Sequence, residues 1–413
     1  MDIAVSLCRA IVEKMLSGAA QMGKYPKVKT VVSFIVVVVL VTGLSIISVH
    51  IWGGKPEEAI HIEELKIDDE MTLREFGQAN DLPNNVLKEL FDLKSPSDLG
   101  KRLDEYGTAE QITVMATRKL ALTSEAASKN WVKIPLKFGL WFIFLPGVFL
   151  YCRKRKVTSV TRKGLLCASV LIFGIIMGAD PSPMGTVKDA IHLYGTAQAI
   201  FPPRMIALMI FLALVFLANK YICAWGCQVG TLQDMIFRIN QTDKHKTIIG
   251  KKIVLPFTFT NTVRIVFLVL FTLVALSWGS DIVEPIDPFK VYKPMYLGLG
   301  GMIFIGLLLV ASLFMYRPWC HLFCPFGLVG WLVEKVSRVR VSVDYDTCIA
   351  CGKCAEACPS TVMSAILKQD KKVIPDCFAC YTCRDVCPTG SIRFSTRKRT
   401  VPPMDHFKKG KKA

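Results

Sequence analysis

Two cysteine runs near the C-terminus have the residue types and spacing of iron–sulfur ligands. They read Cys348-x2-Cys351-x2-Cys354-x3-Cys358-Pro359 and Cys377-x2-Cys380-x2-Cys383-x3-Cys387-Pro388. In each run three thiols fall on one tight turn, and the fourth, before a proline, is directed toward the neighbouring cluster. We therefore expect two 4Fe-4S clusters, one held by Cys348, Cys351, Cys354 and Cys387, the other by Cys377, Cys380, Cys383 and Cys358. Such a module transfers electrons.

The alternatives for this segment are a zinc ribbon and a disulfide knot. Zinc normally takes four ligands from two CxxC pairs, and two consecutive four-cysteine runs exceed that pattern. The residues between the thiols are expected to pack or hydrogen-bond around sulfur rather than react: Lys353, Ala355, Ala379 and Tyr381.

Four more cysteines form two pairs further upstream, Cys223-x3-Cys227 and Cys320-x3-Cys324. In both cases an acid–proline turn, an outer loop and an apolar segment precede the pair. The turns are Asp180-Pro181 and Asp287-Pro288, so one hairpin is used twice. A separation of four residues puts both sulfurs of a pair on one helix face. We expect both pairs where the helices reach the inner membrane surface.

Three interpretations of these four thiols stay open: a further iron–sulfur cluster beneath the membrane surface, a redox-active dithiol, or a zinc site. Four buried free cysteines are the structural alternative. The other thiols, Cys8, Cys152 and Cys167, lack partners at ligand spacing and are expected to be structural.

The composition of the chain is that of a membrane protein. Of its 413 residues, 52% are hydrophobic. Six apolar segments are long enough to predict bilayer crossings, at about 30–52, 134–151, 164–179, 205–221, 263–280 and 297–315. The net charge of +18 comes from basic residues beside these segments and in the tail, so we expect topology determinants and no nucleic-acid partner.

The predicted fold is mainly α. It is a polytopic six-helix transmembrane bundle with an outer helical insert and a C-terminal α+β ferredoxin-like domain. The expected parts are a cytoplasmic amphipathic segment (1–29), a transmembrane anchor (30–52), a periplasmic helical domain (53–133), a transmembrane domain with both hairpins (134–334), the ferredoxin domain (335–395) and a basic tail (396–413).

The basic flank before the first span predicts a cytoplasmic N-terminus, and six crossings return the C-terminus to that side. Cluster thiolates suit a reducing compartment. The predicted location is therefore the cytoplasmic (inner) membrane, with both termini in the cytoplasm.

The hairpins, cysteine pairs and ferredoxin motifs between about 160 and 392 together resemble the NapH/NosR group of membrane polyferredoxins. This resemblance implies an electron-transfer subunit of a quinol dehydrogenase-type system in anaerobic respiration of nitrate or nitrous oxide. It implies partner redox proteins: a periplasmic reductase, a flavoprotein or cytochrome, and a cytoplasmic ferredoxin. Residues 53–133 lack the flavin-threonine signature of the nitrous oxide protein, so FMN is not expected, and Gln228 replaces a family proline.

Two functions of different class follow. The first is electron transfer between the quinone pool, or a cytoplasmic donor, and a periplasmic reductase. The second is a redox-sensing or maturation factor for a respiratory metalloenzyme. A cation-pumping subunit is disfavoured because the spans carry few charges.

Ionisable residues near the outer span ends are candidate quinone or partner contacts, namely Asp180, His192, Asp281, Glu284 and Asp287. They could equally be helix caps and solvated turns. His50, His192 and His321 lie near predicted span boundaries, so a transmembrane haem pair is not expected.

Overall fold

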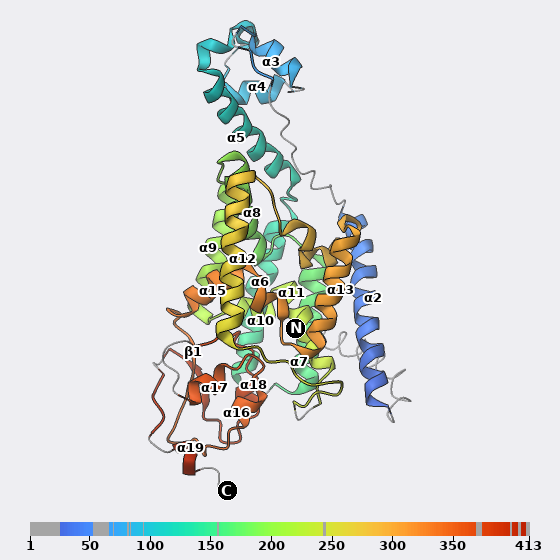
Figure 1. Cartoon of the computed structure of the whole chain (residues 1–413), viewed down its shortest axis with the longest axis vertical. Coiled ribbons are helices and arrows are strands. Elements are labelled where there is room, and N and C mark those ends of the chain that lie inside the picture. Colours follow the sequence, from blue (N-terminus) through green and yellow to red (C-terminus); the bar gives the residue numbers. More distant parts are fainter. Residues whose placement is uncertain are drawn as a thin grey trace.

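The computed structural model describes residues 25–52, 66–68, 70–80, 82, 84–93, 95–154, 157–242, 245–368, 374–396, 399–403 and 406–409. Three regions follow one another along its long axis: a small helical domain, a helix bundle, and the segment with the eight clustered cysteines (Figure 1). We call the two ends of the bundle the insert end and the ferredoxin end. Residues 1–24 with Cys8, and much of the basic tail, lie outside the described residues.

Four helical segments are long and apolar enough to cross a membrane, within the described residues. They are α2 (Pro26–Trp52), α6 (Lys133–Lys154), α7 (Ser159–Ser169) continued by the π-helical turn η4 (Val170–Ile176), and α12 (Phe257–Trp278). Two other predicted spans form shorter apolar helices, α9 (Pro202–Ala218) and α13 (Leu299–Phe314). The mainly helical membrane prediction is confirmed, while the count of six crossings stays a prediction.

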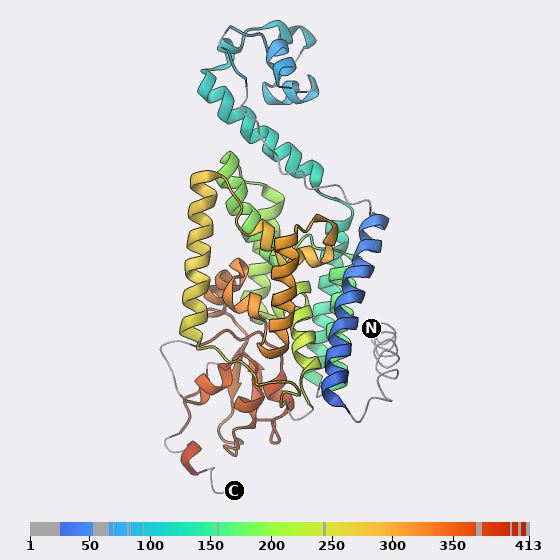
Figure 2. The same cartoon turned by 45° about the vertical axis from the view of Figure 1, so that its right-hand side comes forward.

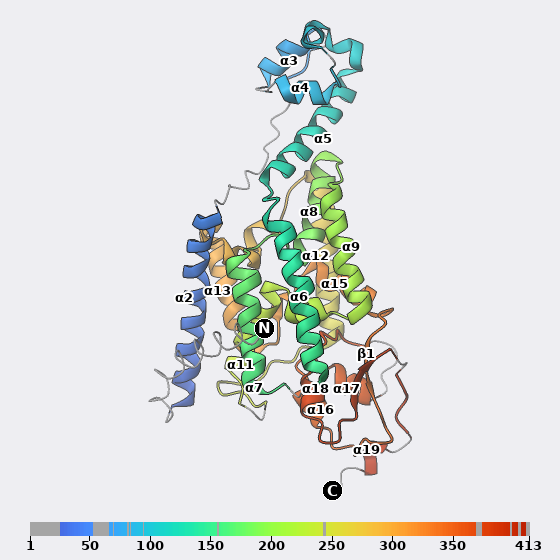
Figure 3. The ribbon, with the colours of Figure 1, turned by 180° about the vertical axis from the view of Figure 1, so that it is seen from behind.

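The outermost helices of the bundle are α2 and α12, which stand on opposite flanks (Figure 2). Apolar side chains cover most of α2, and many of them are exposed, among them Ile35, Val39, Ile47 and Ile51. A helix that is apolar on all sides and exposed in a single chain is suited to contact with lipid. From behind, α6 runs from the insert end to the level of α16 and α18 at the ferredoxin end (Figure 3).

The predicted repeat is visible in the order of the elements. The first copy runs through α7–η4, α8 (Pro183–Ala197), α9, α10 (Tyr221–Trp225) and α11 (Gln228–Ile239). The second runs through α12, the 3-10 turns η5 (Glu284–Ile286), η6 (Pro288–Tyr292) and η7 (Pro294–Tyr296), then α13, α14 (Pro318–Leu322) and α15 (Pro325–Glu334). The copies differ after their first span. The first copy has the helix α8 there, and the second has the 3-10 turns η5, η6 and η7.

After α9 and α13 the chain turns back into the bundle. The Trp319 ring packs against Phe304 at 6.2 Å between centroids, although α13 continues from Phe304 to its end at Phe314. In the first copy, the indole Nε1 of Trp141, inside α6, donates to the Gly226 carbonyl at 3.0 Å. The short helices α10 and α14 are therefore re-entrant, and Figure 1 shows α10 and α11 about midway along α2.

The insert is a small helical unit with its own core. It contains α3 (Leu73–Ala79), α4 (Asn84–Leu90), η2 (Pro96–Gly100), η3 (Leu103–Tyr106) and α5 (Ala109–Ser128). Capping boxes at Thr72, Ser95 and Thr108 satisfy the first backbone amides of three of these elements. Apolar residues near the end of α5 pack against the α8–α9 connection, which joins the insert to the bundle.

The ferredoxin end has short helices and a small sheet. The helices are α16 (Lys353–Ala357), α17 (Val362–Leu367), α18 (Thr382–Asp385) and α19 (His406–Lys409). Strands β1 (Arg340–Val343) and β2 (Ile392–Ser395) pair antiparallel, with Arg340 opposite Ser395 and Val343 opposite Ile392. The sheet closes the segment by joining its two ends.

Candidate functional site

The eight clustered cysteines gather as the two predicted sets. The pKa of Cys354 is raised to about 11, first by burial and then by the charges of Cys387, Cys348 and Cys351. Burial raises the pKa of Cys383 well above its usual value, and the charges of Cys358, Cys380 and Cys377 add to this. The fourth thiol of each run thus lies beside the other run. Ligation by these sets stays a prediction that the arrangement fits.

Both runs use the same unusual backbone to turn their thiols inward. Ala350 (φ 57°) and Gly352 (φ 71°) are left-handed in the first run, and Ala379 (φ 50°) and Tyr381 (φ 61°) are left-handed at the same positions of the second. Non-glycine residues seldom adopt this conformation unless their surroundings hold them there. Packing holds Tyr381, whose ring lies 4.2 Å from that of Phe394 between centroids.

The described sulfurs are not arranged for a single metal ion. No group of three or more His, Cys, Asp or Glu residues in the described part of the chain could hold one. A tetrahedral zinc site needs each sulfur at about 2.3 Å from the metal, which brings the sulfurs close together. A cubane separates its ligands with a cage of iron and sulfide, so it accepts thiols that lie further apart than the ligands of one zinc ion.

The two sets face different surroundings. In the first set Cys351 is exposed, and the neighbouring Ile349 side chain is 59% exposed. In the second set Cys377 and Cys383 are buried. The first set is therefore partly open to solvent, while the second faces the bundle.

Each upstream cysteine pair spans a helix break. Cys223 lies in α10 and Cys320 in α14, whereas Cys227 and Cys324 are the N-cap residues of α11 and α15. Both caps are extended, with ψ of 118° and 116°. The prediction that each pair shares one helix face is therefore wrong. For Cys324 the reason is Pro325, which disfavours helical backbone at the preceding residue.

The pairs lie inside the bundle rather than at its inner surface, which corrects the predicted depth. Cys227 is near enough to Lys137, in the insert-end half of α6, for their charges to interact. All four thiols are less than 10% exposed, and the charges of Cys320, Cys227 and Cys223 act on Cys324. The re-entrant helices bring the two copies of the motif together at this depth.

The cysteine loops of the two copies are held by crossed contacts. Lys220, just before Cys223, donates to the Gly327 carbonyl of the other copy at 2.9 Å. Arg317, at the same position before Cys320, donates to the Cys223 and Ala224 carbonyls. Neither cation was singled out from the sequence. Both stand three residues before the first cysteine of a pair, as Lys220-x2-Cys223 and Arg317-x2-Cys320, and this repeated spacing could have indicated them.

Glycine allows the closest approach within each loop. A Cβ on Gly230 would lie 2.7 Å from the Cys223 carbonyl oxygen, and a Cβ on Gly327 would lie 2.8 Å from that of Cys320. Any other residue would displace the backbone that carries a thiol.

Buried positive charge surrounds the four thiols. The buried cations whose charges act on these thiols are Lys137, Lys220, Arg264 and Arg317. Asp376 pairs with Lys220 at 2.8 Å and with Arg264 at 2.6 Å, and Asp234 pairs with Arg317 at 2.8 Å and with Arg238 at 2.7 Å. These two carboxylates are outnumbered by the buried cations around them. Buried charge requires compensation, and a cluster with four thiolates is an anion that supplies it.

The second ferredoxin set is packed directly against these loops. Asp376 precedes Cys377, and its carboxylate lies among the bundle cations. The Trp225 indole donates to the Ala379 carbonyl at 3.3 Å. The Phe378 ring lies under Lys220 and Arg317, at 4.7 Å and 5.0 Å. The segment between two predicted ligands therefore touches both upstream loops.

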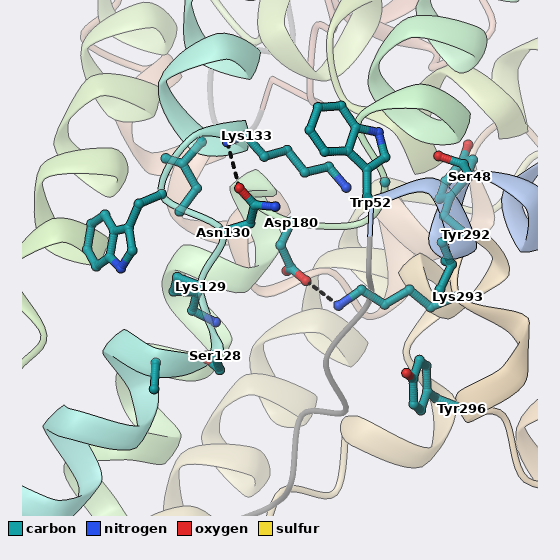
Figure 4. A pocket seen from close by; sticks show the side chains of 15 residues that line it. Ser48, Trp52, Ser128, Lys129, Asn130, Lys133, Asp180, Tyr292, Lys293 and Tyr296 are labelled. Atoms are coloured by element: carbon teal, nitrogen blue, oxygen red, sulfur yellow. Dashed lines mark hydrogen bonds and ion pairs between the residues drawn. The ribbon is translucent and has the colours of Figure 1, made fainter.

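Two cavities adjoin at the insert end. The larger, about 370 Å³, lies between the end of α2, the α5–α6 connection and η6–η7, and its lining includes Trp52, Lys133 and Tyr292 (Figure 4). The smaller, about 230 Å³, includes Lys188, Glu284 and Asp287. Asp180, Lys293 and Tyr296 line both.

The wall of the larger cavity is linked to the loop that carries Cys227. Tyr292, in its wall, donates its hydroxyl to the Gln228 carbonyl at 2.9 Å. The Gln228 amide donates to the Ala179 carbonyl at 2.6 Å, and Gln228 directly follows Cys227. Gln228 thus joins the cavity wall to the cysteine loop.

Five residues near the outer span ends were predicted as quinone or partner contacts, and three of them line these cavities: Asp180, Glu284 and Asp287. Asp281 accepts from the amides of Val283 and Glu284, and it pairs with Lys188 at 2.9 Å. The His192 ring bonds the Gly279 carbonyl at 3.1 Å. Asp281 therefore acts as a turn cap.

Two family models match the chain. A 4Fe-4S dicluster domain matches residues 341–394, which hold the eight clustered cysteines. A 4Fe-4S binding domain matches residues 200–256 and 297–343, which hold the two upstream pairs. The matched segments therefore coincide with both groups of candidate ligands.

Curated relatives include redox proteins. The putative electron transport protein YccM of Escherichia coli (strain K12) is 30% identical over 180 residues, 41% of this chain and 49% of the relative. The methylamine utilization ferredoxin-type protein MauN is 24% identical in Methylobacillus flagellatus, over 39% of this chain and 58% of the relative, and 27% identical in Paracoccus denitrificans, over 42% and 61%.

The chain thus spans about half the length of the curated relatives it matches. No solved structure matches it. The domains and the apolar helices together indicate an iron–sulfur protein of the membrane type that is similar to curated electron transport and ferredoxin-type proteins.

Proposed function

We propose that this protein carries electrons along its bundle, between clusters at the ferredoxin end and a quinone at the insert end. The observation that carries the proposal is the position of the four upstream thiols. They lie inside the bundle, touching the second ferredoxin set on one side and joined by Gln228 to the larger cavity on the other. Clusters at these positions would divide the path of an electron across the membrane into shorter steps.

The proposed cofactors are three 4Fe-4S clusters. The C-terminal cysteines would hold two in the sets named above, and Cys223, Cys227, Cys320 and Cys324 would hold the third. When bound, the clusters supply one-electron transfer. The surplus of buried cations and the crossed backbone contacts position the third set and favour an anionic centre there.

The larger cavity suits a quinone head group. Small-ligand sites are concave and mostly apolar, with few polar groups, and this cavity combines four aromatic residues with Lys133. The Lys133 ammonium lies 5.2 Å from the Trp52 ring centre and is a donor for a carbonyl oxygen. Trp52 and Trp131 are at the ends of apolar helices, where tryptophan marks the membrane interface.

The proposed setting is the cytoplasmic membrane, with both termini in the cytoplasm and residues 53–133 in the periplasm. There the protein would serve a NapH/NosR-type respiratory system with a periplasmic reductase. The positive-inside distribution of basic residues supports this orientation. Reporter fusions after Ser128 and Ser395 test it, because they should report opposite sides of the membrane.

Anaerobic purification and chemical analysis test the cofactor proposal. We expect about twelve irons per chain for three cubanes, against about eight for the C-terminal pair alone. A short-chain quinone added to the chemically reduced protein, after the excess reductant has been removed, should restore the visible absorption of the oxidised clusters. A protein with the full iron content whose clusters exchange no electrons with quinone or quinol would contradict the proposed function and favour a sensing role.

A further inference from the structure

The two acid–proline turns of the repeat meet at one cavity. Asp180 of the first copy pairs with Lys293 of the second at 2.8 Å. Asp287 of the second copy faces Lys188 of the first at 3.7 Å. The pairing is crossed, as it is around the cysteine loops, and all four residues line the smaller cavity. This cavity is therefore built at the interface of the two copies.

The smaller cavity adjoins the larger one through a charged wall. Asp180, Lys293 and Tyr296 line both cavities. In Figure 4 the Lys293 side chain reaches across to the Asp180 carboxylate. Although burial opposes ionisation, the charges of Lys293 and Lys129 hold the pKa of Asp180 well below its usual range. Asp180 thus stays charged and fixes Lys293 at the boundary.

Asp287 is placed differently. Its carboxylate accepts from the Phe289 amide at 2.8 Å, and its residue is 8% exposed. The charged groups that face it or line the same cavity are Lys188, Asp189, Glu284, Lys290, Asp180 and Lys293, with Asp281 bonded to Lys188. Burial, with the charges of Glu284 and Asp189, raises the pKa of Asp287 to about 7, against the lowering effect of Lys188 and the Phe289 amide.

We propose that the smaller cavity is the proton-exchange chamber of the quinone site and that Asp287 is its proton-relay residue. This inference rests on the proposed function, since the quinone would occupy the larger cavity. Oxidation of one quinol breaks two O–H bonds. The iron–sulfur centres, when bound, would take its two electrons one at a time. Its two protons would pass in turn, through water in the smaller cavity, to the Asp287 carboxylate.

The chamber has an outlet at Glu284. Its side chain is 43% exposed, and it pairs with Lys188 at 2.8 Å and with Lys290 at 2.7 Å. A cavity of about 230 Å³ lined by charged groups has the polarity and room to hold water molecules. A proton on Asp287 therefore has a polar route to bulk water, and Asp287 is ready for the next proton.

The test compares Asp287→Asn with the wild type in the full-length, cluster-loaded protein. Asparagine keeps the shape and removes the titrating proton. Infrared spectroscopy should show a protonated carboxyl that titrates near pH 7 in the wild type and is lost in the variant. This readout does not depend on turnover. Asp104→Asn is the control, because Asp104 forms an exposed ion pair with Arg102 in the insert and should leave the titration unchanged.

The second measurement is the rate at which decylubiquinol reduces the clusters as a function of pH. In the wild type the rate should rise as pH rises through 7, because the ionised Asp287 accepts the proton. Asp287→Asn should lose that step and slow reduction by about 100-fold, a usual effect of removing a proton acceptor, with KM for the quinol unchanged.

Two results overturn the inference alone: an Asp287→Asn rate and pH profile equal to the wild type, or a raised KM at constant kcat, which would mean contact with the carrier. A wild-type protein with full iron content that decylubiquinol does not reduce would overturn the proposed function as well.

Discussion

The two groups of cysteines in this molecule are positioned by opposite means. The eight at the ferredoxin end come from one short stretch of chain, and left-handed residues at fixed places within it turn the thiols inward. The four in the bundle come from two segments about a hundred residues apart, and a buried cation from each segment holds the loop of the other. One group is organised locally, and the other exists only in the assembled bundle.

This difference indicates how each group responds to change. Around the ferredoxin thiols a substitution acts mainly through a ligand or its own turn. Around the bundle thiols, removal of a charge that never contacts the cluster should be enough to lose it. The bundle site is also the one closed to solvent, because all four of its thiols are buried while Cys351 is exposed.

The largest expected effects come from removing one ligand in each group. Cys383→Ser and Cys324→Ser should each lower the iron content by about four per chain, the content of one cubane. In Cys324→Ser the paramagnetic signals of the two C-terminal clusters should persist after reduction. Cys167→Ser, outside both groups, is the control and should keep all its iron. Full iron in Cys324→Ser would contradict the bundle centre.

The second-largest effect is expected from removing a cation from the bundle site. Arg317→Leu leaves Asp234 with one buried cation, Arg238, and the Cys223 loop without its donor. Breaking a buried ion pair destabilises by about 3–5 kcal/mol, so we expect a lower Tm and loss of the bundle iron alone.

The matched surface variant is Arg393→Leu, at the ferredoxin end. Its pair with Asp344 is exposed on the arginine side, with 57% of the side chain accessible, and such pairs contribute about 0–1 kcal/mol. Equal Tm changes in Arg317→Leu and Arg393→Leu would argue against tertiary positioning of the bundle thiols.

A smaller effect is expected from a single added methyl group. Gly327→Ala places a Cβ against the Cys320 carbonyl, and overpacking of this kind costs about 1–3 kcal/mol. We expect partial loss of the bundle iron. Gly306→Ala, in the same half of the repeat, meets nothing within 4 Å and should match the wild type. Indistinguishable iron contents in the two variants would disprove the close approach.

The smallest expected effect concerns how the stability of the insert end depends on pH. Burial raises the pKa of Glu284, but the charges of Lys188 and Lys290 have the larger effect and lower it from 4.5 to about 2. A carboxyl with a lowered pKa stabilises the fold above its usual pKa and loses that contribution as pH falls from 4.5 to 2.

Glu284→Gln should therefore be slightly less stable than the wild type at pH 7, and the two should converge in acid. The difference in Tm between the two proteins measures this, since any acid loss of clusters affects both. A difference that stays constant down to pH 2 would show that the ion pairs of Glu284 contribute nothing.

Local patterns in the sequence were sufficient for the ferredoxin end. The spacing of Cys348 to Cys358 and of Cys377 to Cys387 predicted the two sets, and the structure brings the same thiols together. The apolar segments likewise predicted the helices, although the observed helix ends differ from the predicted ones. The helix of the third predicted span begins at Ser159 and ends in a π-helical turn. Hydrophobic periodicity identifies a helix but determines its ends poorly.

The sequence by itself determined what depends on near neighbours: apolar helices, two cysteine runs on tight turns, and a hairpin used twice. Only the tertiary structure decided the depth of Cys223, Cys227, Cys320 and Cys324, the crossed pairing of Lys220 and Arg317, and the meeting of Asp180 with Asp287 at one cavity. The physical reason is that a thiol or a charge gains its surroundings from elements distant in the chain. Such surroundings exist only after the two copies have packed against each other.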